Sequence, residues 1–256
     1  MKRPVLFYIL FFCISTMTLS AENSTKVIAH RGFWDCEGSA QNSLAALKKA
    51  AEIGVYGSEF DVIVTADGIP VVNHDEKIGG MLIEATPYLT IKDIKLTNGE
   101  KLPTLEVFLE EAKKLHGIRL FLEIKPHSTS EKESRAVEII TALVDSMDMA
   151  YRTEYISFSK HIVQEIARRV KKAEIAYLNG DLSPKRLKEM GCTGLDYHHR
   201  KLHWRPWLIK QAKEEGLTIN SWTVNSSLMM RWLINKKADY ITTDKPLKLQ
   251  EVLKNK

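Results

Sequence analysis

Two short stretches decide the fold, SEFDV at residues 58–62 and LEIKP at residues 122–126. Glu59 and Asp61 lie two residues apart in the first, and Glu123 and Lys125 lie two apart in the second. Alternate residues of a β-strand point to the same face, so each pair would face one common space. Buried unpaired carboxylates are costly, and a hard divalent cation, which prefers several carboxylate oxygens, would compensate for them. The two stretches therefore predict that three carboxylates and a lysine meet around a metal ion.

Outward from these stretches, short strand-like runs alternate with helical patterns. Eight strand–helix units with short returns predict a parallel sheet, and their number and the chain length favour an α/β fold closed into a (β/α)8 TIM barrel. An open doubly wound sheet is the alternative architecture. The predicted strands are residues 27–29, 55–62, 119–124, 155–158, 174–178, 194–197, 217–224 and 240–242.

Residues 63–103 interrupt this regular alternation between the second strand and its helix. They are too long for an ordinary loop and contain the turn Ala66-Asp67-Gly68. Long segments of this kind inside compact domains are usually functional. We expect a small inserted subdomain with a hairpin, which also carries Asn73-His74-Asp75.

The first 21 residues have the order of a secretory signal peptide. Lys2 and Arg3 precede an apolar run from Val5 to Ile14, and small polar residues follow. The alternative is a membrane anchor, but a run of about ten apolar residues is well short of the roughly twenty that span a bilayer. We expect cleavage near Ala21, residues 22–256 as the exported barrel in the periplasm or outside the cell, and no stable membrane insertion afterwards.

Charge and composition limit the partners of the chain. The formal net charge is +5, and it falls to +3 without Lys2 and Arg3. This balance is too mild for nucleic-acid binding, which usually leaves a strong basic footprint. We expect a small-molecule substrate, and the sequence leaves the oligomeric state open.

Chemically active side chains gather where the predicted strands end, which is where a barrel of this kind places its active site. His30-Arg31-Gly32 ends the first strand, Trp222 ends the seventh, and Asp244 follows the eighth. The inserted segment adds His74 at the same face. The sequence therefore predicts three carboxylates, two histidines, an arginine and a lysine on one rim.

At this point the chain resembles the glycerophosphodiester phosphodiesterase family over nearly all of its mature length. The His-Arg-Gly opening at 30–32, Glu-x-Asp-Val at 59–62, Val-x-His-Asp at 72–75 and Leu-Glu-Ile-Lys at 122–125 follow the family's order. The resemblance implies hydrolysis of glycerophosphodiesters to glycerol 3-phosphate and an alcohol with a divalent ion, Ca²⁺ or Mg²⁺. It implies metal ligands at Glu59, Asp61 and Glu123, a general acid/base pair at His30 and His74, and phosphate contacts at Arg31 and Lys125.

The chain departs from the family before its first helix. Members have Pro-Glu-Asn-Thr, whereas this sequence has Ala40-Gln41-Asn42-Ser43. Asn42 is retained and is expected to contact substrate or phosphate. Gln41 removes one charge near the site, which leaves the number and affinity of the metal ions open.

Three readings compete with this activity. A phosphodiesterase of the phosphatidylinositol-specific phospholipase C type would need access to intact lipid, and no strongly amphipathic apolar rim is evident. A phosphate-binding barrel without turnover is the second, against which the intact His30 and His74 argue. An amidohydrolase-type barrel would carry His-x-His on its first strand, which is absent here. At the level of the site, Glu59 and Asp61 could instead pair with Arg31 and Lys125 without any metal.

The remaining predictions concern aromatic and sulfur-containing residues. Trp222 is expected either to cap the barrel core or to wall the pocket for the glycerol or alcohol moiety. Cys36 and Cys192 lie at opposite ends of the predicted barrel, beyond the roughly 7 Å limit for a disulfide, so we expect no bond between them. The segment 198–207 could form a second metal site, but its spacing matches no ligand pattern, so an aromatic loop facing substrate or plain surface is expected; its candidates are His198, His199, His203, Trp204 and Trp207.

Overall fold

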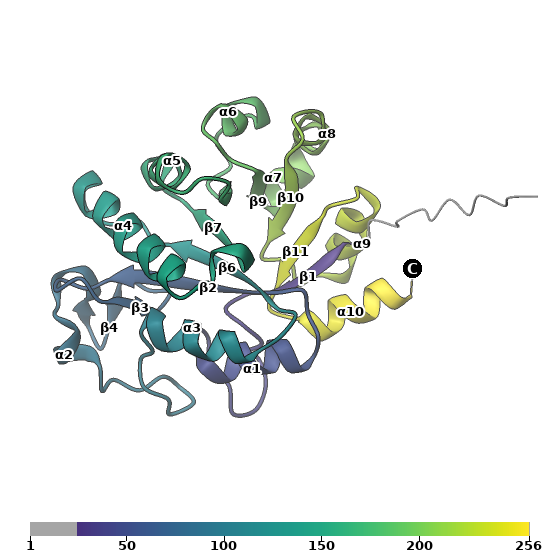
Figure 1. The fold of residues 1–256 in the computed structure, drawn as a ribbon. Coiled ribbons are helices and arrows are strands. Elements are labelled where there is room, and N and C mark those ends of the chain that lie inside the picture. Colours follow the sequence, from purple (N-terminus) through teal and green to yellow (C-terminus); the bar gives the residue numbers. More distant parts are fainter. Residues whose placement is uncertain (1–24, 256) are drawn as a thin grey trace, which may run out of the picture.

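Eight parallel strands form a nearly closed barrel in the computed structural model, which describes residues 25–255 (Figure 1). The first strand pairs with both the second and the last, so the sheet curls round instead of opening into a doubly wound sheet. The prediction of a (β/α)8 barrel is confirmed. In spatial order the strands are β10 (Thr218–Trp222), β9 (Gly194–His198), β8 (Glu174–Tyr177), β7 (Thr153–Ser157), β6 (Arg119–Ile124), β2 (Gly57–Val64), β1 (Lys26–Ala29) and β11 (Tyr240–Thr243).

The seam between β10 and β11 is bridged just beyond the ends of the strands. The Val224 amide donates to the Thr242 carbonyl at 3.0 Å, and the Asp239 amide donates to the Ile219 carbonyl at 2.9 Å. The Asp239 carboxylate also accepts from the Ile219 amide at 2.8 Å. These bonds satisfy backbone groups that an open sheet edge would leave exposed.

An outer ring of helices covers the strands, so each strand has one face packed against helices and one face turned to the barrel interior. On β2, Phe60 faces outward and stacks on Phe108 of α3 with ring centroids 4.3 Å apart. Glu59 and Asp61 alternate with it and therefore face the barrel interior. The helices are α1 (Leu44–Glu52), α3 (Leu105–Lys114), α4 (Ser130–Ser146), α5 (Lys160–Arg169), α6 (Pro184–Glu189), α7 (His199–Trp204), α8 (Trp207–Glu214), α9 (Ser227–Asn235) and α10 (Pro246–Lys254), with a 3-10 turn η2 (Ala150–Arg152) after α4.

The inserted segment lies beside α3 and carries its own small apolar cluster (Figure 1). It comprises β3 (Pro70–Val72), the hairpin β4 (Lys77–Ile78) and β5 (Met81–Leu82), the turn η1 (Ile83–Ala85) and α2 (Tyr88–Ile91). β3 pairs antiparallel with the end of β2 through the expected turn at Ala66-Asp67-Gly68. Because β2 extends to Val64, residue 63 belongs to the barrel strand rather than to the insertion. The cluster consists of Ile63, Val71, Ile83, Ile91 and Leu102.

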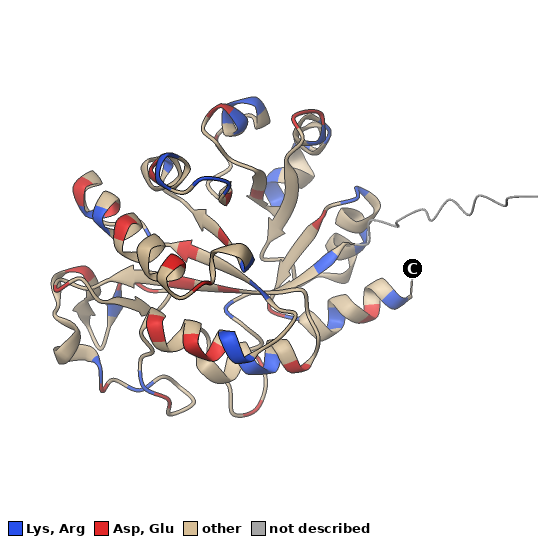
Figure 2. Cartoon of the chain, in the orientation of Figure 1, with Lys and Arg blue, Asp and Glu red and all other residues tan. Residues whose placement is uncertain are grey.

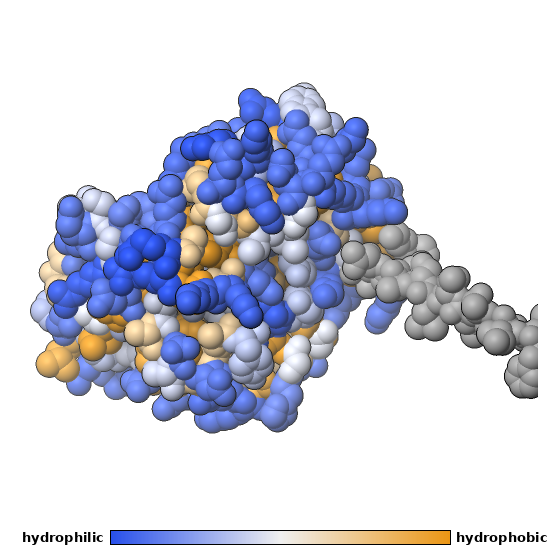
Figure 3. Space-filling model, turned by 45° about the horizontal axis from the view of Figure 1, so that its top comes forward, coloured by the Kyte–Doolittle hydropathy of each residue, from blue (hydrophilic) through white to orange (hydrophobic). Residues whose placement is uncertain are grey.

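Lys and Arg lie largely on the outer helices and loops, whereas acidic residues also occur within β2 and β6 (Figure 2). The face in Figure 3 is mostly hydrophilic, with hydrophobic residues visible near its centre. Among residues 25–255, no helix combines the length and apolarity needed to cross a bilayer. Cys36 follows β1, Cys192 precedes β9, and both are free thiols. The predicted signal peptide lies outside the described residues.

Candidate active site

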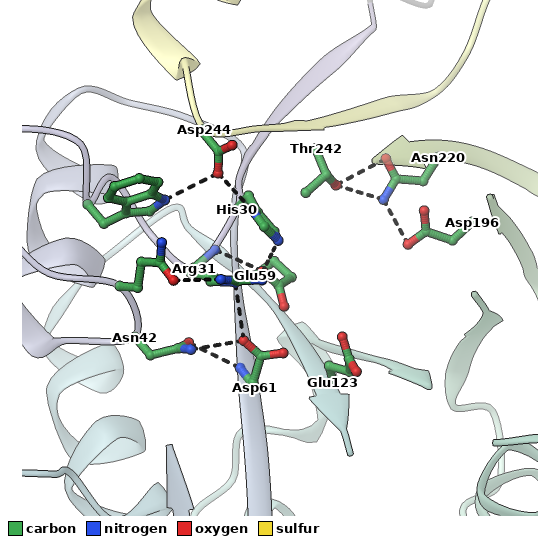
Figure 4. A network of polar contacts seen from close by, with 12 residues as sticks. His30, Arg31, Asn42, Glu59, Asp61, Glu123, Asp196, Asn220, Thr242 and Asp244 are labelled. Carbon is green, nitrogen blue, oxygen red and sulfur yellow. Dashed lines mark hydrogen bonds and ion pairs between the residues drawn. The ribbon is translucent and has the colours of Figure 1, made fainter. Parts of the chain in front are cut away.

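Three buried carboxylates meet at the carboxyl ends of β2 and β6. Asp61 lies beside Glu123 in the parallel register of these strands, and Glu59 lies two residues earlier on the same face. The side chains of Glu59, Asp61 and Glu123 each offer an oxygen within 4.8 Å of the other two. Figure 4 shows them pointing toward one space. The structure therefore brings together the three predicted metal ligands.

The turn after β1 holds two of these acids in place. The Arg31 amide donates to Glu59 Oε2 at 2.8 Å. Asn42, in a left-handed conformation with φ of 61°, donates from Nδ2 to Asp61 Oδ2 at 2.9 Å and accepts the Asp61 amide on Oδ1 at 3.2 Å. Both ends of the Asn42 amide are thus committed to Asp61. Asn42 is buried and is not among the residues that line the pocket, so in this structure it positions Asp61, and its expected contact with substrate stays a prediction.

Two cationic side chains compensate part of the acidic charge. Lys125 Nζ lies 2.8 Å from Glu123 Oε1 and 3.3 Å from Asp61 Oδ1, and Arg31 Nε lies 3.7 Å from Asp61 Oδ2. Gln41, which replaces the family's glutamate, accepts a bond from Arg31 Nη1 at 2.5 Å. The substitution therefore keeps an acceptor that orients Arg31 while removing its negative charge.

The pKa values of the three acids differ because their neighbours differ. Burial would raise the pKa of Asp61, but Lys125, His74, the bond from Asn42 and Arg31 together lower it. Burial, then Asp61 and Glu123, raise the pKa of Glu59 well above its usual value. Burial and the Asp61 charge likewise raise the pKa of Glu123. The site thus holds more buried acid than its own cations neutralise.

This donor set fits a divalent cation. Carboxylate oxygens within 4.8 Å of one another can all reach one ion at the roughly 2.3–2.6 Å typical of calcium. The raised pKa of Glu59 marks the charge that Arg31 and Lys125 leave uncompensated. Structural ion pairing with Arg31 and Lys125 serves Asp61 and Glu123 and would leave Glu59 without a permanently charged side-chain partner, at the cost of a buried charge.

Each histidine of the site has a carboxylate on Nδ1. His30 Nδ1 lies 2.7 Å from Asp244 Oδ1, and His74 Nδ1 lies 2.7 Å from Asp75 Oδ1. Asp244 also accepts from Asn225 at 2.7 Å and from Trp34 at 3.2 Å. Burial would raise the pKa of Asp244, but the bonds from His30 and Asn225 lower it to about 2. Sequence analysis placed Asp244 and Asp75 near this rim without giving them a role.

Burial lowers the pKa of His74, and Lys125 and Arg31 lower it further against the raising effects of Asp61 and Asp75. Neutral imidazole therefore dominates at His74 near pH 7. With a carboxylate acceptor at Nδ1, the neutral form of either ring would carry its proton on Nδ1 and present Nε2 as an acceptor. His30 Nε2 lies 3.9 Å from Glu59 Oε2, directly beside the acidic cluster.

A pocket in the mouth of the barrel joins these groups. Trp222 forms part of its wall, packs edge-on against Phe158 with centroids 5.3 Å apart, and donates from Nε1 to the Asp196 carbonyl at 3.1 Å. Trp222 also packs against the buried cluster of Ile156, Ala176 and Leu178, so its position agrees with both expected roles. The lining consists of His30, Arg31, Glu59, His74, Phe121, Glu123, Ile156, Phe158, Leu178, Asp196, Asn220, Trp222, Thr223 and Thr242.

Within the segment 198–207, the residues His199–Trp204 form the helix α7 where a loop or plain surface was expected. His198 packs edge-on against Trp222 with centroids 5.2 Å apart, next to the pocket. Trp204 and Trp207 are exposed at 77% and 54%, so they lie on the surface. Asp196 and Asn220, which sequence analysis missed, lie two residues before His198 and Trp222 on β9 and β10. Their period-2 spacing from the strand ends is the signal that could have identified them.

A parallel eight-stranded barrel that gathers buried acids, two histidines and two cations around its pocket has the groups that hydrolysis of a phosphate ester needs. The model of the Glycerophosphoryl diester phosphodiesterase family matches residues 30–248 of this chain. The chain therefore belongs to the glycerophosphoryl diester phosphodiesterase family, and it is an enzyme of the phosphoric diester hydrolase type.

Similar proteins agree with this membership. A glycerophosphodiester phosphodiesterase of Caldanaerobacter subterraneus is 28% identical over 241 residues, covering 87% of this chain and 95% of that protein. The crystal structure of a glycerophosphodiester phosphodiesterase from Parabacteroides distasonis is 50% identical, with a TM-score of 0.90, covering 91% and 98% of the two chains. An Oleispira antarctica phosphodiesterase, solved with the product sn-glycerol-3-phosphate, is 25% identical with a TM-score of 0.77, covering 90% and 97%.

Proposed function

We propose that this protein hydrolyses glycerophosphodiesters to glycerol 3-phosphate and an alcohol, using a divalent metal ion, Ca²⁺ or Mg²⁺, and two histidines. The observation that carries the proposal is the convergence of the acidic cluster with two aspartate-bound histidines in one pocket. The product complex of the Oleispira antarctica relative supports the substrate class.

Glu59, Asp61 and Glu123 would hold the metal ion. When bound, the ion supplies positive charge that polarises the phosphoryl oxygens. Arg31, oriented by Gln41, is a planar two-pronged donor suited to a second phosphoryl oxygen, and Lys125 adds a point charge from the side of Asp61 and Glu123. Together they stabilise the negative charge that builds at phosphorus.

His30 and His74 would exchange the two protons of the reaction. The attacking oxygen loses a proton to Nε2 of one ring, and the leaving alkoxide gains a proton from the other. Asp244 and Asp75 orient the rings and stabilise each imidazolium as it forms. This division needs one ring in each protonation state, which two imidazoles can reach near neutral pH.

We further propose that the enzyme acts outside the cytoplasm. The order of basic, apolar and small residues in the first 21 positions supports export. The N-terminus of the protein recovered from its cells tests the proposal: a start near residue 22 agrees with it, and retention of Met1 or Lys2 contradicts it.

The activity is tested by release of glycerol phosphate from glycerophosphocholine and glycerophosphoethanolamine. His30→Ala should abolish turnover and leave metal binding, measured by calorimetry, unchanged. A normal rate in His30→Ala would remove the histidine from the mechanism. Cleavage of phosphatidylinositol in place of the two glycerophosphodiesters would favour the phospholipase C type, and substrate binding without turnover would favour a binding barrel.

A further inference from the structure

Three polar side chains line the part of the pocket opposite the acidic cluster. Asp196, Asn220 and Thr242 come from the adjacent strands β9, β10 and β11. Asn220 Nδ2 lies 3.0 Å from Asp196 Oδ2 and 2.9 Å from Thr242 Oγ1, and Thr242 donates to Asn220 Oδ1 at 3.2 Å. In Figure 4 this trio lies apart from Glu59 and Glu123, on the side of β11 and β10.

One atom of this trio has no partner. Asp196 Oδ1 is buried without a hydrogen bond among the described residues, although Asp196 is only 2% exposed. The amide of Asn220 is fully used, because its Oδ1 also accepts the Ser221 amide at 2.8 Å. Buried polar atoms are normally paired, and burial raises the pKa of Asp196 to about 7 against the lowering effect of the bond from Asn220. Asp196 is therefore a strong acceptor, or a donor when protonated, that the protein itself does not satisfy.

The rest of this pocket suits a small molecule with both apolar and hydroxyl groups. Phe158, Leu178 and Trp222 supply apolar walls beside Asp196. Small-molecule sites commonly combine such walls with a few polar groups that fix orientation. The proposed metal, phosphate and proton-transfer roles use none of the three polar residues, so their chemistry is available for another part of the substrate.

A second space flanks the site on the side of the inserted segment. This open groove, with a volume of about 770 Å³, is lined by Trp34, Gln41 and Asp75 among others, whereas the pocket that holds Asp196 has a volume of about 100 Å³. A phosphodiester has two ester arms that leave phosphorus in different directions. The smaller pocket fits the small glycerol arm, and the wide groove fits an alcohol of variable size.

We propose that Asp196, held by Asn220, which Thr242 anchors in turn, binds a hydroxyl group of the substrate's glycerol moiety and makes the enzyme selective for glycerol esters. The proposal rests on the proposed function and extends it by assigning the two arms of the substrate to the two spaces. A hydrogen bond that satisfies this buried carboxyl oxygen gives a preference of about tenfold over an arm without hydroxyls.

Calorimetric binding of sn-glycerol 3-phosphate and n-propyl phosphate tests the proposal, because the two ligands differ only in their hydroxyl groups. The metal-loaded wild-type protein should bind glycerol phosphate about tenfold more tightly or better. Asp196→Leu should remove this difference by weakening glycerol phosphate alone. Should Asp196→Leu fail to fold, Asp196→Ala is measured in the same way. Glu154→Gln, which removes another buried acid of the barrel interior that does not line the pocket, should keep the preference.

Three outcomes overturn the proposal. The first is equal binding of the two ligands by the wild-type protein, and the second is an unchanged preference in the Asp196 variant. The third is a variant that weakens phosphocholine while glycerol phosphate binds normally, since this would place the alcohol arm in the pocket. Preferential binding of glycerol phosphate without any turnover would refute the proposed function and leave this inference standing. Turnover of glycerophosphocholine without the preference would do the reverse.

Discussion

His30 and His74 reach the same pocket from different parts of the chain, and each is held through Nδ1 by an aspartate. His74 and Asp75 are neighbours in the sequence, whereas Asp244 lies 214 residues from His30 and follows the last strand. Asp244 is the better anchored of the two, because Trp34 and Asn225 also donate to it. The orientation of His30 therefore depends on barrel closure.

Asp244→Asn should lower kcat by about a hundredfold, the low end of what acid–base catalysis contributes. The amide can donate to Nδ1 and so favours the wrong tautomer of His30. Steady-state kinetics check this, with Asp93→Asn as the control, because Asp93 is an exposed acid paired with Lys101 on the insertion. A kcat within twofold of wild type would mean that Asp244 does not position His30.

At the residue scale, sequence patterns predict the charged groups but not their supports. The period-2 placement of Glu59 with Asp61 and of Glu123 with Lys125 is sufficient to bring these side chains to one face. The role of Asn42 depends on a left-handed backbone turn that aims its amide at Asp61, and no periodic pattern encodes such a turn.

The turn between β1 and α1 is the element that joins the histidine to the acidic cluster. Gly32 has a φ of 77°, and its amide donates to the carbonyls of Ala29 and Glu59 at 3.2 and 3.1 Å. A Cβ there would lie 2.6–2.9 Å from atoms of Ala46, including its backbone. The close approach of α1 to the turn therefore requires glycine.

Gly32→Ala should lower the free energy of unfolding by about 2–4 kcal/mol, combining the left-handed strain with overpacking against α1. Gly99→Ala is the matched control, because Gly99 has a φ of 87° but open space around it. Chemical denaturation of both variants isolates the packing contribution. Equal losses in the two variants would show that α1 yields to the added methyl group.

Among the elements, the strands and long helices follow from apolar periodicity, and the departures have local causes. α7 escapes prediction because Leu202 is its single buried residue, so His199–Trp204 carries no apolar stripe. β2 extends to Val64 because β3 pairs with its end, a contact that depends on the course of the insertion. α4 is capped by Thr129, which accepts from the Lys132 amide, and Glu133 accepts from the Ser159 hydroxyl near the start of α5.

The active-site residues lie at the carboxyl ends of the barrel strands, and a separate group of charged residues lies at the amino ends. Glu154, at the start of β7, lies beside Glu174 in register and near Arg119. Burial, together with the charges of Asp196 and Glu174, raises the pKa of Glu154 to about 8. A raised carboxyl pKa means that the folded state keeps a proton that the unfolded chain releases above pH of about 4.5. Glu154 therefore reduces stability progressively as pH rises from about 4.5 to 8.

Glu154→Gln should raise the free energy of unfolding at pH 8 and leave it nearly unchanged at pH 5. The gain in the free energy of unfolding at pH 8 should exceed the gain at pH 5 by more than about 1 kcal/mol, since one pKa unit corresponds to about 1.4 kcal/mol. Denaturant titrations of wild type and variant at both pH values measure it. A variant less stable than wild type at pH 8 would mean that the Glu154 charge is favourably paired with Arg119.

At the scale of the whole molecule, eight strand–helix units predict the closed barrel because a parallel sheet of eight strands can pair its first strand with its last and leave no free edge. The depth of the pocket is a different matter. Whether Asp196 and Asn220 lie below the pocket or line it depends on the stagger of β9, β10 and β11, which is set by packing around the whole barrel.

The central claim is that the acids of β2 and β6 bind a divalent cation on which hydrolysis depends. Glycerol phosphate release by rigorously demetallated protein tests it most directly. The account predicts that activity is lost on demetallation, returns with Ca²⁺ or Mg²⁺, and needs a higher ion concentration in Glu59→Gln. Full activity in the demetallated sample would contradict it.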